Sequence, residues 1–267
     1  MGRAKGPGPR SLDGLRWLAR VDVAGLEPWG MALGFGWRAT YSHAARLQAA
    51  GLAVRLYDRE GSVIAITGAG RRLVCADGGE PRLGATRGLG LRHARAVSWV
   101  AALLTVRDRS WVSDRELRDR ADWRVPVFWP NSHGTHRPDA GAVVGGRRVA
   151  VEVELSHKAA RRLRAILAGY EALIADGTVD GGLLYVSDRA DVLQTVTRAA
   201  TRVGIPASAF KARKLGQVQE ELRRYVHARR DAAPSGVAYP DSGAPEPAGF
   251  GLGNAVRVVR RAGGEAA

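Results

Sequence analysis

Apolar residues recur at helical spacing in the first part of the chain. Leu12, Leu15 and Leu18 lie three residues apart, and a second apolar run, LEPWGMAL, ends at a Gly-Phe-Gly turn at residues 34–36. A further periodic segment, residues 37–50, follows at once. The pattern predicts three consecutive helices, with a tight glycine turn between the second and the third.

The third predicted helix has an apolar and a polar face. Its spacing places Ala44 and Leu47 inward. We expect five residues on the outward face: Arg38, Thr40, Tyr41, His43 and Arg46. Gly51 then ends the helix, and two strand-like runs, AVRLYD and VIAIT, flank a turn at residues 59–62. The pattern predicts a β-hairpin directly after the third helix.

The segment RLQAAGLAVRLYDREGSVIAITGAGRRL resembles the winged helix-turn-helix domains of bacterial regulators. The resemblance implies that the third helix enters the major groove of double-stranded DNA. It also implies which side chains contact the DNA. Arg59 on the wing would lie against a phosphate or in the minor groove, and four residues would enter the major groove: Arg38, Thr40, Tyr41 and Arg46. A protein-docking module is the alternative interpretation.

The second part of the chain alternates between helical and strand patterns. Residues 91–104 form an apolar helical run, and Ser113 with Glu116 has the spacing of a capping box. A strand is expected to begin at RVPVFW. The segment HRPDAGAVVGGRRVAVEVELSHKAARRL, residues 136–163, then predicts a hairpin that turns at two glycines and runs into a helix.

Three carboxylates are expected to converge in this hairpin. Because side chains alternate along a strand, Glu152 and Glu154 share one face. The glycine turn brings Asp139, at the start of the first strand, back toward them. Such a cluster repels itself unless a cation or a proton neutralises it. A hard divalent ion, Mg²⁺ or Mn²⁺, is the expected occupant.

The same residues resemble the PD-(D/E)xK nuclease superfamily. Pro138-Asp139 supplies the first motif and Glu152 the second acidic residue, while Glu154 stands where a lysine is expected, and Lys158 is the candidate replacement. The resemblance implies that Asp139 and Glu152 bind the metal, and that Glu154 or Lys158 orients or deprotonates the attacking water. The implied reaction is hydrolysis of a phosphodiester.

Two simpler interpretations of these residues stay open. Glu152 and Glu154 can form the solvent face of an edge strand, paired with Arg147, Arg148 or Arg161. Alternatively, nearby histidines suggest zinc, although no two of them have the i, i+4 spacing of a helical zinc motif: His133, His136 and His157.

The charge and composition of the chain indicate a class of binding partner and a cellular compartment. The formal net charge of +15, from 41 Lys and Arg against 26 Asp and Glu, favours a polyanionic partner, although a coding bias toward arginine is an alternative source. Cys75 is the single cysteine, which excludes an intrachain disulfide and fits a reducing cytoplasm. No apolar run is long enough for a membrane span.

The predicted fold class is α/β (α+β), a winged helix followed by an α/β domain whose central mixed sheet is flanked by helices. Residues 1–12 and 231–267 lack periodic patterning, and residues 78–90 are rich in glycine. We therefore expect five segments, which are a flexible basic tail (1–12), the winged helix (13–77), a linker (78–90), the nuclease-like domain (91–230) and a mostly disordered tail (231–267).

The motifs RHARAVSWVAALL, WVSDRELR, RPDA and VAVEVELSHK together resemble the replication-relaxation family of actinobacterial plasmids and mobile elements. The resemblance implies a role in replication of such an element. Three hypotheses follow, which are a metal-dependent DNA endonuclease or nickase, a non-catalytic replication or transcription regulator, and a repressor that senses a small molecule. A homodimer is left open.

Overall fold

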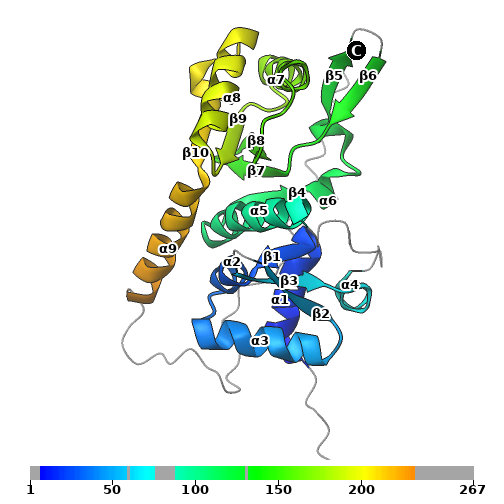
Figure 1. Ribbon diagram of the computed structural model, residues 1–267, viewed down its shortest axis with the longest axis vertical. Helices are drawn as coiled ribbons and strands as arrows, with labels where there is room; N and C mark the ends of the chain where they lie inside the picture. The colour runs from blue at the N-terminus through cyan, green and yellow to red at the C-terminus, as the bar shows by residue number, and fades with distance from the viewer. Residues whose placement is uncertain (1–6, 59–60, 76–87, 130–131, 232–267) are drawn as a thin grey trace, which may run out of the picture.

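The computed structural model describes residues 7–58, 61–75, 88–129 and 132–231. These residues form a mixed α/β fold with a central mixed sheet and flanking helices, so the predicted fold class is confirmed at this level. We divide the chain into an N-terminal module, residues 9–74, and a second module, residues 88–231. Figure 1 shows the N-terminal module below the second one, with α5 between them.

The N-terminal module consists of helices packed on a small antiparallel sheet with the strand order β1-β3-β2. Pro9 stands in the first turn of α1, where its missing N–H costs nothing. Gly51 adopts a left-handed φ of 69° and turns the chain from α3 into β2. The elements in order are α1 (Pro9–Val21), β1 (Val23–Gly25), α2 (Leu26–Ala32), α3 (Trp37–Ala49), β2 (Ala53–Asp58), β3 (Gly61–Ile66) and α4 (Gly68–Val74).

The second module is built on a five-stranded sheet with the order β10-β9-β8-β7-β4. The three strands β8, β9 and β10 run parallel, while β7 is antiparallel to both β8 and β4. Its elements are α5 (Gly88–Val106), β4 (Ser110–Ser113), α6 (Asp114–Leu117), β5 (Val125–Trp129), β6 (Ser132–His136), β7 (Ala140–Val144), β8 (Arg147–Val153), α7 (Ala160–Ala175), β9 (Gly182–Ser187), α8 (Ala190–Val203), β10 (Phe210–Lys214) and α9 (Leu215–Asp231).

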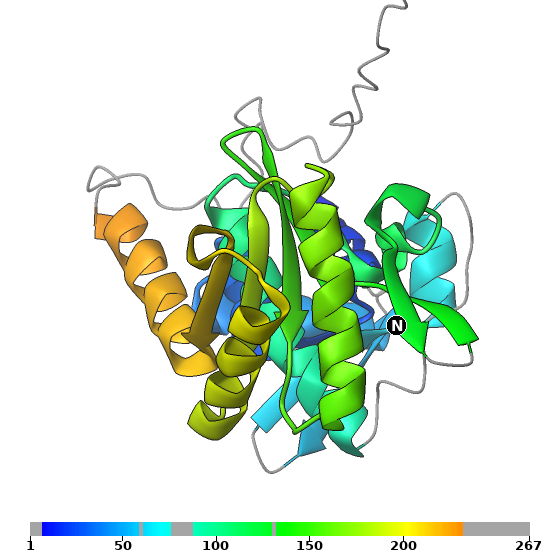
Figure 2. The same cartoon turned by 90° about the horizontal axis from the view of Figure 1, so that it is seen from above.

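Helices cover both faces of this sheet. Val151 and Val153 of β8 pack in the same core as α5, whereas Ala150 packs with α7 and α8 on the opposite face. The alternation follows directly from the period of two along a strand. Figure 2 shows α7 and α8 on the near side of the strands and α5 behind them. Strands β5 and β6 form a separate two-stranded hairpin beside α7.

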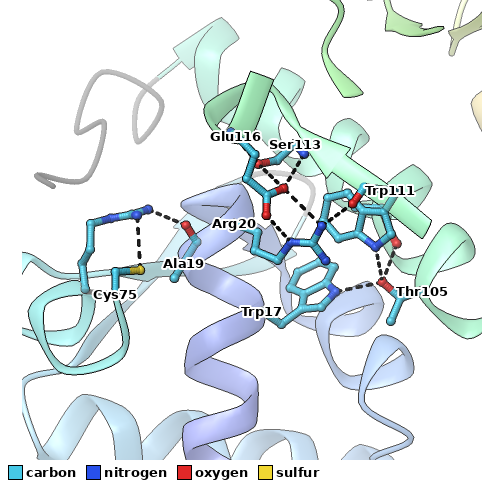
Figure 3. Close-up of polar contacts among 10 residues, drawn as sticks. Trp17, Ala19, Arg20, Cys75, Thr105, Trp111, Ser113 and Glu116 are labelled. Carbon is cyan, nitrogen blue, oxygen red and sulfur yellow. Dashed lines mark hydrogen bonds and ion pairs between the residues drawn. The ribbon is translucent and has the colours of Figure 1, made fainter. Parts of the chain in front are cut away.

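The two modules share one continuous apolar core. Leu15 and Leu18 of α1 belong to the same buried cluster as Trp99 and Ala102 of α5. Figure 3 shows the polar contacts that border this core. There, Trp17 Nε1 donates to Thr105 Oγ1 at 3.0 Å, and Arg20 pairs with Glu116 at 3.0 Å and stacks on the Trp111 ring.

Helix α9 reaches back from the second module to the N-terminal one. Arg223 pairs with Glu27 of α2 at 2.8 Å, and Arg230 donates to the carbonyl of Phe35 at 2.8 Å. Figure 1 shows α9 running down one side of the molecule past α5 toward α2. The modules are therefore held together on this side as well as through the shared core.

Two of the expected segment boundaries need correction. Residues 9–12, expected in a flexible tail, lie in α1, where Ser11 is buried and contacts His43 Nδ1 at 2.8 Å. Residues 88–90, expected in the linker, begin α5. The rest of the linker and all of the C-terminal tail after residue 231 lie outside the described residues. Within the described ranges, no helix combines the length and the hydrophobicity that a membrane crossing requires.

Candidate functional site

Asp139 is fixed at the point where β7 begins. Its Oδ2 accepts the backbone N–H of Val153 at 2.8 Å, and its carbonyl accepts the backbone N–H of Asp114 at 3.1 Å. The register pairs Ala140 with Val151, so Asp139 lies opposite the end of β8. The predicted approach of Asp139 to the second hairpin strand therefore exists.

Glu152 is buried in the interior of the sheet. Strand β8 lies between β7 and β9, and the Glu152 residue is only 2% exposed. Its Oε1 accepts a hydrogen bond from the Tyr170 hydroxyl of α7 and lies 2.6 Å from His136 Nε2. The alternative interpretation of Glu152 as the solvent face of an edge strand is therefore wrong.

The buried charge of Glu152 affects the neighbouring phenols. Burial, followed by the negative charge of Glu152 and its hydrogen bond, raises the pKa of Tyr170 well above its usual value. Burial and then the charges of Glu152 and Asp139 also raise the pKa of Tyr185. Both phenols therefore stay protonated, and Tyr170 remains a donor to the carboxylate.

Glu154 and Lys158 form an ion pair just beyond the end of β8. Glu154 is 8% exposed, and its backbone N–H donates to the Val186 carbonyl at 2.8 Å. Lys158 Nζ contacts Glu154 Oε2. Lys158 precedes α7, which begins at Ala160. Glu154 pairs with Lys158 and not with the surface arginines that the alternative interpretation proposed.

Sequence reasoning missed His93 of α5 as a site residue. Its Nε2 lies 3.0 Å from the Val153 carbonyl oxygen and 3.3 Å from Asp139 Oδ2. Both neighbours are acceptors, so Nε2 carries a proton. Burial alone lowers the pKa of His93, but the hydrogen bond and charge of Asp139, with the Val153 carbonyl and Glu152, outweigh it and raise the pKa above its usual value.

The Asp139 carboxylate, the Val153 carbonyl and the proton on His93 Nε2 meet at one point. The negative charge of Glu152 also acts on His93, so its carboxylate lies near this point. Carboxylate and carbonyl oxygens are the type of ligand that Mg²⁺ takes in proteins, usually one or two carboxylates together with substrate phosphates. Within the described ranges, no group of three or more His, Cys, Asp and Glu side chains is arranged to hold a metal. The structure joins Asp139 to the end of β8, but it gives Glu152 and Glu154 separate partners.

The three histidines of the zinc interpretation point to three different partners. His133 packs edge-on against Phe128 with ring centroids 5.4 Å apart, and His136 contacts Glu152. His157 lies 3.0 Å from Asp191 Oδ2. The zinc interpretation therefore fails, because the turn after β8 carries His157 away from the β5–β6 hairpin.

The outward face of α3 agrees with the expected one only in part. Arg38 and Arg46 are exposed, and Tyr41 is half-buried. Thr40 is 2% exposed, and its Oγ1 donates to the Gly36 carbonyl at 2.9 Å. The expectation that Thr40 faces outward is therefore wrong.

The close packing of α2 and α3 explains this correction. A Cβ added at Gly30 of α2 would lie 2.1 Å from Thr40 Oγ1, so the glycine makes room for the Thr40 side chain. His43, also expected to face outward, is buried and stacks on Phe35 with centroids 4.3 Å apart. Arg59, the expected wing contact, lies outside the described residues.

Two exposed aromatic residues of the N-terminal module were also missed. Trp37 is 63% exposed and Tyr57 is 70% exposed. Their spacing is a signal in the sequence, because positions 37 and 41 share one face of a helix and positions 55 and 57 share one face of a strand.

Comparison of the sequence with models of known protein families gives no match, and comparison with curated proteins gives none either. Among solved structures, the fold is weakly similar to protein VC1899 from Vibrio cholerae, with 12% sequence identity and a TM-score of 0.35. The match covers 85% of this chain and 58% of that chain, so this chain spans little more than half of its length.

Proposed function

We propose that this protein binds double-stranded DNA through its N-terminal module and hydrolyses phosphodiester bonds as a metal-dependent endonuclease or nickase. The observation that carries the proposal is the placement of Asp139 against the end of β8, beside the buried Glu152 and next to the Glu154–Lys158 ion pair. Replication or transfer of a plasmid or mobile element is the setting that the sequence resemblance implies.

The order of elements in the N-terminal module supports a winged helix-turn-helix. Helices α2 and α3 are joined by residues 33–36, and β2 and β3 follow α3 as an antiparallel pair completed by β1. This arrangement leaves one side of α3 uncovered, with Arg38 and Arg46 exposed on it. In our proposal that side enters the major groove, and the arginines contact base edges or phosphates.

The second module supports a PD-(D/E)xK-like fold in the same way. Helix α5 precedes the β4-β7-β8 antiparallel strands, α7 follows them, and β9 adds in parallel to β8. The acidic residues stand at the beginning of β7 and the end of β8, which are neighbouring positions in an antiparallel pair. This order of elements and these acidic positions support our proposal of a PD-(D/E)xK-like domain.

Each site residue then has a chemical role. Asp139 and Glu152, with the Val153 carbonyl, would hold Mg²⁺ or Mn²⁺. When bound, such an ion lowers the pKa of a water molecule and screens the phosphate charge. Tyr170 and His136 hold the Glu152 carboxylate in one orientation. Lys158 is held by Glu154 next to this position, where its ammonium can orient the attacking water or balance charge on the phosphate.

The test is cleavage of supercoiled plasmid by the full chain with Mg²⁺ or Mn²⁺ and with EDTA. We expect nicked or linear product with the metal, none with EDTA, and background levels for Asp139→Asn and Glu152→Gln. Asp122→Ala is the matched control, because Asp122 is an exposed carboxylate that pairs with Arg148 away from the site. Cleavage that persists in Asp139→Asn would refute the assignment.

A second candidate is a non-catalytic DNA-binding regulator, and one observation favours it. Glu152 and Glu154 already have protein partners, so both carboxylates are held in place without an added ion. In this case the wild-type protein gives no metal-dependent product. Asp139→Asn then keeps full DNA affinity, whereas Arg38→Ala and Arg46→Ala lose it in gel-shift titrations.

A further inference from the structure

Two large aromatic side chains lie uncovered on the surface of the N-terminal module. Trp37 at the start of α3 is 63% exposed, and Tyr57 near the end of β2 is 70% exposed. Indole and phenol rings in such positions leave considerable apolar area in water, and contiguous apolar area of this kind often marks a binding surface. Arg38 follows Trp37 directly on α3 and is also exposed.

These rings form a connected group with Tyr41 and Arg55, which we call the aromatic patch (Trp37, Tyr41, Arg55 and Tyr57). The Trp37 and Tyr41 ring centroids are 4.5 Å apart. The Arg55 guanidinium lies 4.9 Å from the Tyr41 centroid and 5.4 Å from the Tyr57 centroid. The patch therefore crosses from α3 to β2 without a break.

The Arg55 guanidinium packs against the rings of Tyr41 and Tyr57. Its Nε is buried and has no hydrogen-bond partner within residues 7–58, 61–75, 88–129 and 132–231. A guanidinium over the faces of two tyrosines keeps its positive charge while it presents a flat surface. The patch consequently combines flat apolar faces with positive charge.

The charge around the patch selects the kind of partner. Helix α3 has the sequence WRATYSHAARLQA, which contains arginine and histidine but no aspartate or glutamate. Arg38 and Arg46 are exposed on it. A partner that carries negative charge and also offers flat π-faces suits this surface, and a nucleic acid has both properties.

The exposed aromatic faces of the patch favour unpaired over paired nucleotides. In a duplex each base face is covered by its stacked neighbours, so only base edges and phosphates are accessible. An unpaired base exposes its face and can stack on an aromatic ring or a guanidinium. We propose that the aromatic patch binds unpaired DNA bases next to the duplex that α3 contacts, so that the protein prefers junctions between double-stranded and single-stranded DNA. This inference rests on the DNA binding in the proposed function and not on the hydrolysis.

The experiment compares three fluorescein-labelled DNA probes by anisotropy, using the full chain in EDTA buffer so that no cleavage occurs. The probes are an oligothymidylate, a blunt duplex, and the same duplex with an oligothymidylate extension. We expect Trp37→Ala and Tyr57→Ala to lower affinity for the extended duplex and the oligothymidylate by about 5- to 100-fold, the loss of one stacked base. Blunt-duplex affinity should change less than about twofold.

Two further variants control for general effects. Phe128→Ala removes a ring that is 64% exposed on the second module, and we expect it to leave all three affinities unchanged. Trp37→Phe keeps a π-face and should retain most of the affinity for the extended duplex. Circular dichroism melting should match the wild type for each variant, because the mutated side chains are largely exposed.

The outcomes separate this inference from the proposed function. Equal losses on blunt and extended duplexes, or no loss on either, would overturn the inference. A wild-type dimer that becomes a monomer in Trp37→Ala, measured by sedimentation, would make the patch a protein interface and also overturn it. If the wild type prefers the extended duplex but cleaves nothing, the inference stands and the hydrolysis fails. If no probe binds, both DNA binding and the inference fail.

Discussion

Both modules bury a carboxylate, and they neutralise it in different ways. In the N-terminal module, Asp22 is 6% exposed and pairs with the fully buried Arg71, which also donates to the Ala19 carbonyl at 2.6 Å. In the second module, Glu152 is held by His136 and Tyr170. A guanidinium keeps its charge at all accessible pH values, whereas the phenol of Tyr170 and the imidazole of His136 hold Glu152 by short polar contacts without a permanent counter-ion.

The difference indicates different roles for the two carboxylates. A permanent counter-ion makes Asp22 part of the structure, since nothing else is needed to balance it. Glu152 has no permanent counter-ion, so an added cation can interact with it, and His93 and Asp139 lie beside it. The comparison predicts that the first pair matters most for stability and that only the second site responds to divalent ions.

The largest expected effect on stability comes from breaking the Asp22–Arg71 pair. Arg71→Ala leaves the buried Asp22 without its main counter-ion, because the other nearby cation, Arg115, is farther from the carboxylate at 3.8 Å. The substitution should lower the free energy of unfolding by about 3 to 5 kcal/mol. Urea unfolding followed by circular dichroism measures the change. Arg38→Ala, an exposed arginine in the same module, should stay within about 0.5 kcal/mol. A loss below about 1 kcal/mol in Arg71→Ala would remove the distinction between the two carboxylates.

The second expected effect is a response to metal at Glu152. Mg²⁺ or Mn²⁺ at one hundred times its dissociation constant should raise the wild-type free energy of unfolding by about 2.7 kcal/mol. Thermal unfolding with metal and with EDTA measures the shift. Glu152→Gln should show none, because the amide lacks the charge that favours the ion. An equal shift in the wild type and the variant would place the ion elsewhere.

A smaller effect is expected at the donor that holds Glu152. Tyr170→Phe removes the hydroxyl that donates to the buried carboxylate, while His136 remains. We expect a loss of about 1.5 kcal/mol in urea unfolding, the lower end of the range for a hydrogen bond to a charged group. Metal-dependent stabilisation should persist in this variant. Its disappearance would mean that Tyr170 is needed for the ion as well as for the fold.

The smallest effect is expected at an exposed pair. Glu27 of α2 and Arg223 of α9 are paired at the surface, with both side chains more than a third exposed. Glu27→Gln should cost about 0.2 to 1 kcal/mol, and the loss should shrink as salt is added. Urea unfolding at low and high salt tests this. A loss as large as that of Arg71→Ala would show that burial does not decide the strength of these pairs.

Local patterns in the sequence predicted much of the fold. The capping box of Ser113 and Glu116 is present, with both hydrogen bonds of the motif. The hairpin of β7 and β8, with its turn at Gly145 and Gly146, is confirmed, since both glycines have a positive φ. These features depend on residues a few positions apart, which is the range over which turn and capping preferences act.

Features that depend on distant residues were missed or mistaken. The burial of Glu152 comes from β9 and α7, which pack around β8 only after the chain has folded. His93 reaches Val153 from sixty residues away in the sequence. Thr40 was placed outward because it is polar, but a glycine on α2 accommodates its short side chain. Pattern alone therefore does not show which parts of the chain cover a given face of an element.

Helix α5 has a consequence for how such a protein can change by recombination. Its buried residues belong to the core that includes α1 as well as to the core beneath β7 and β8. A gene exchange that replaced only residues 9–74 would leave this helix facing a foreign surface and expose apolar area on both sides of the joint. If the exchanged gene segment also carried its own α5, the packing of α5 on α1 would be kept, but its packing on β7 and β8 would be lost. The two modules are therefore expected to be inherited together.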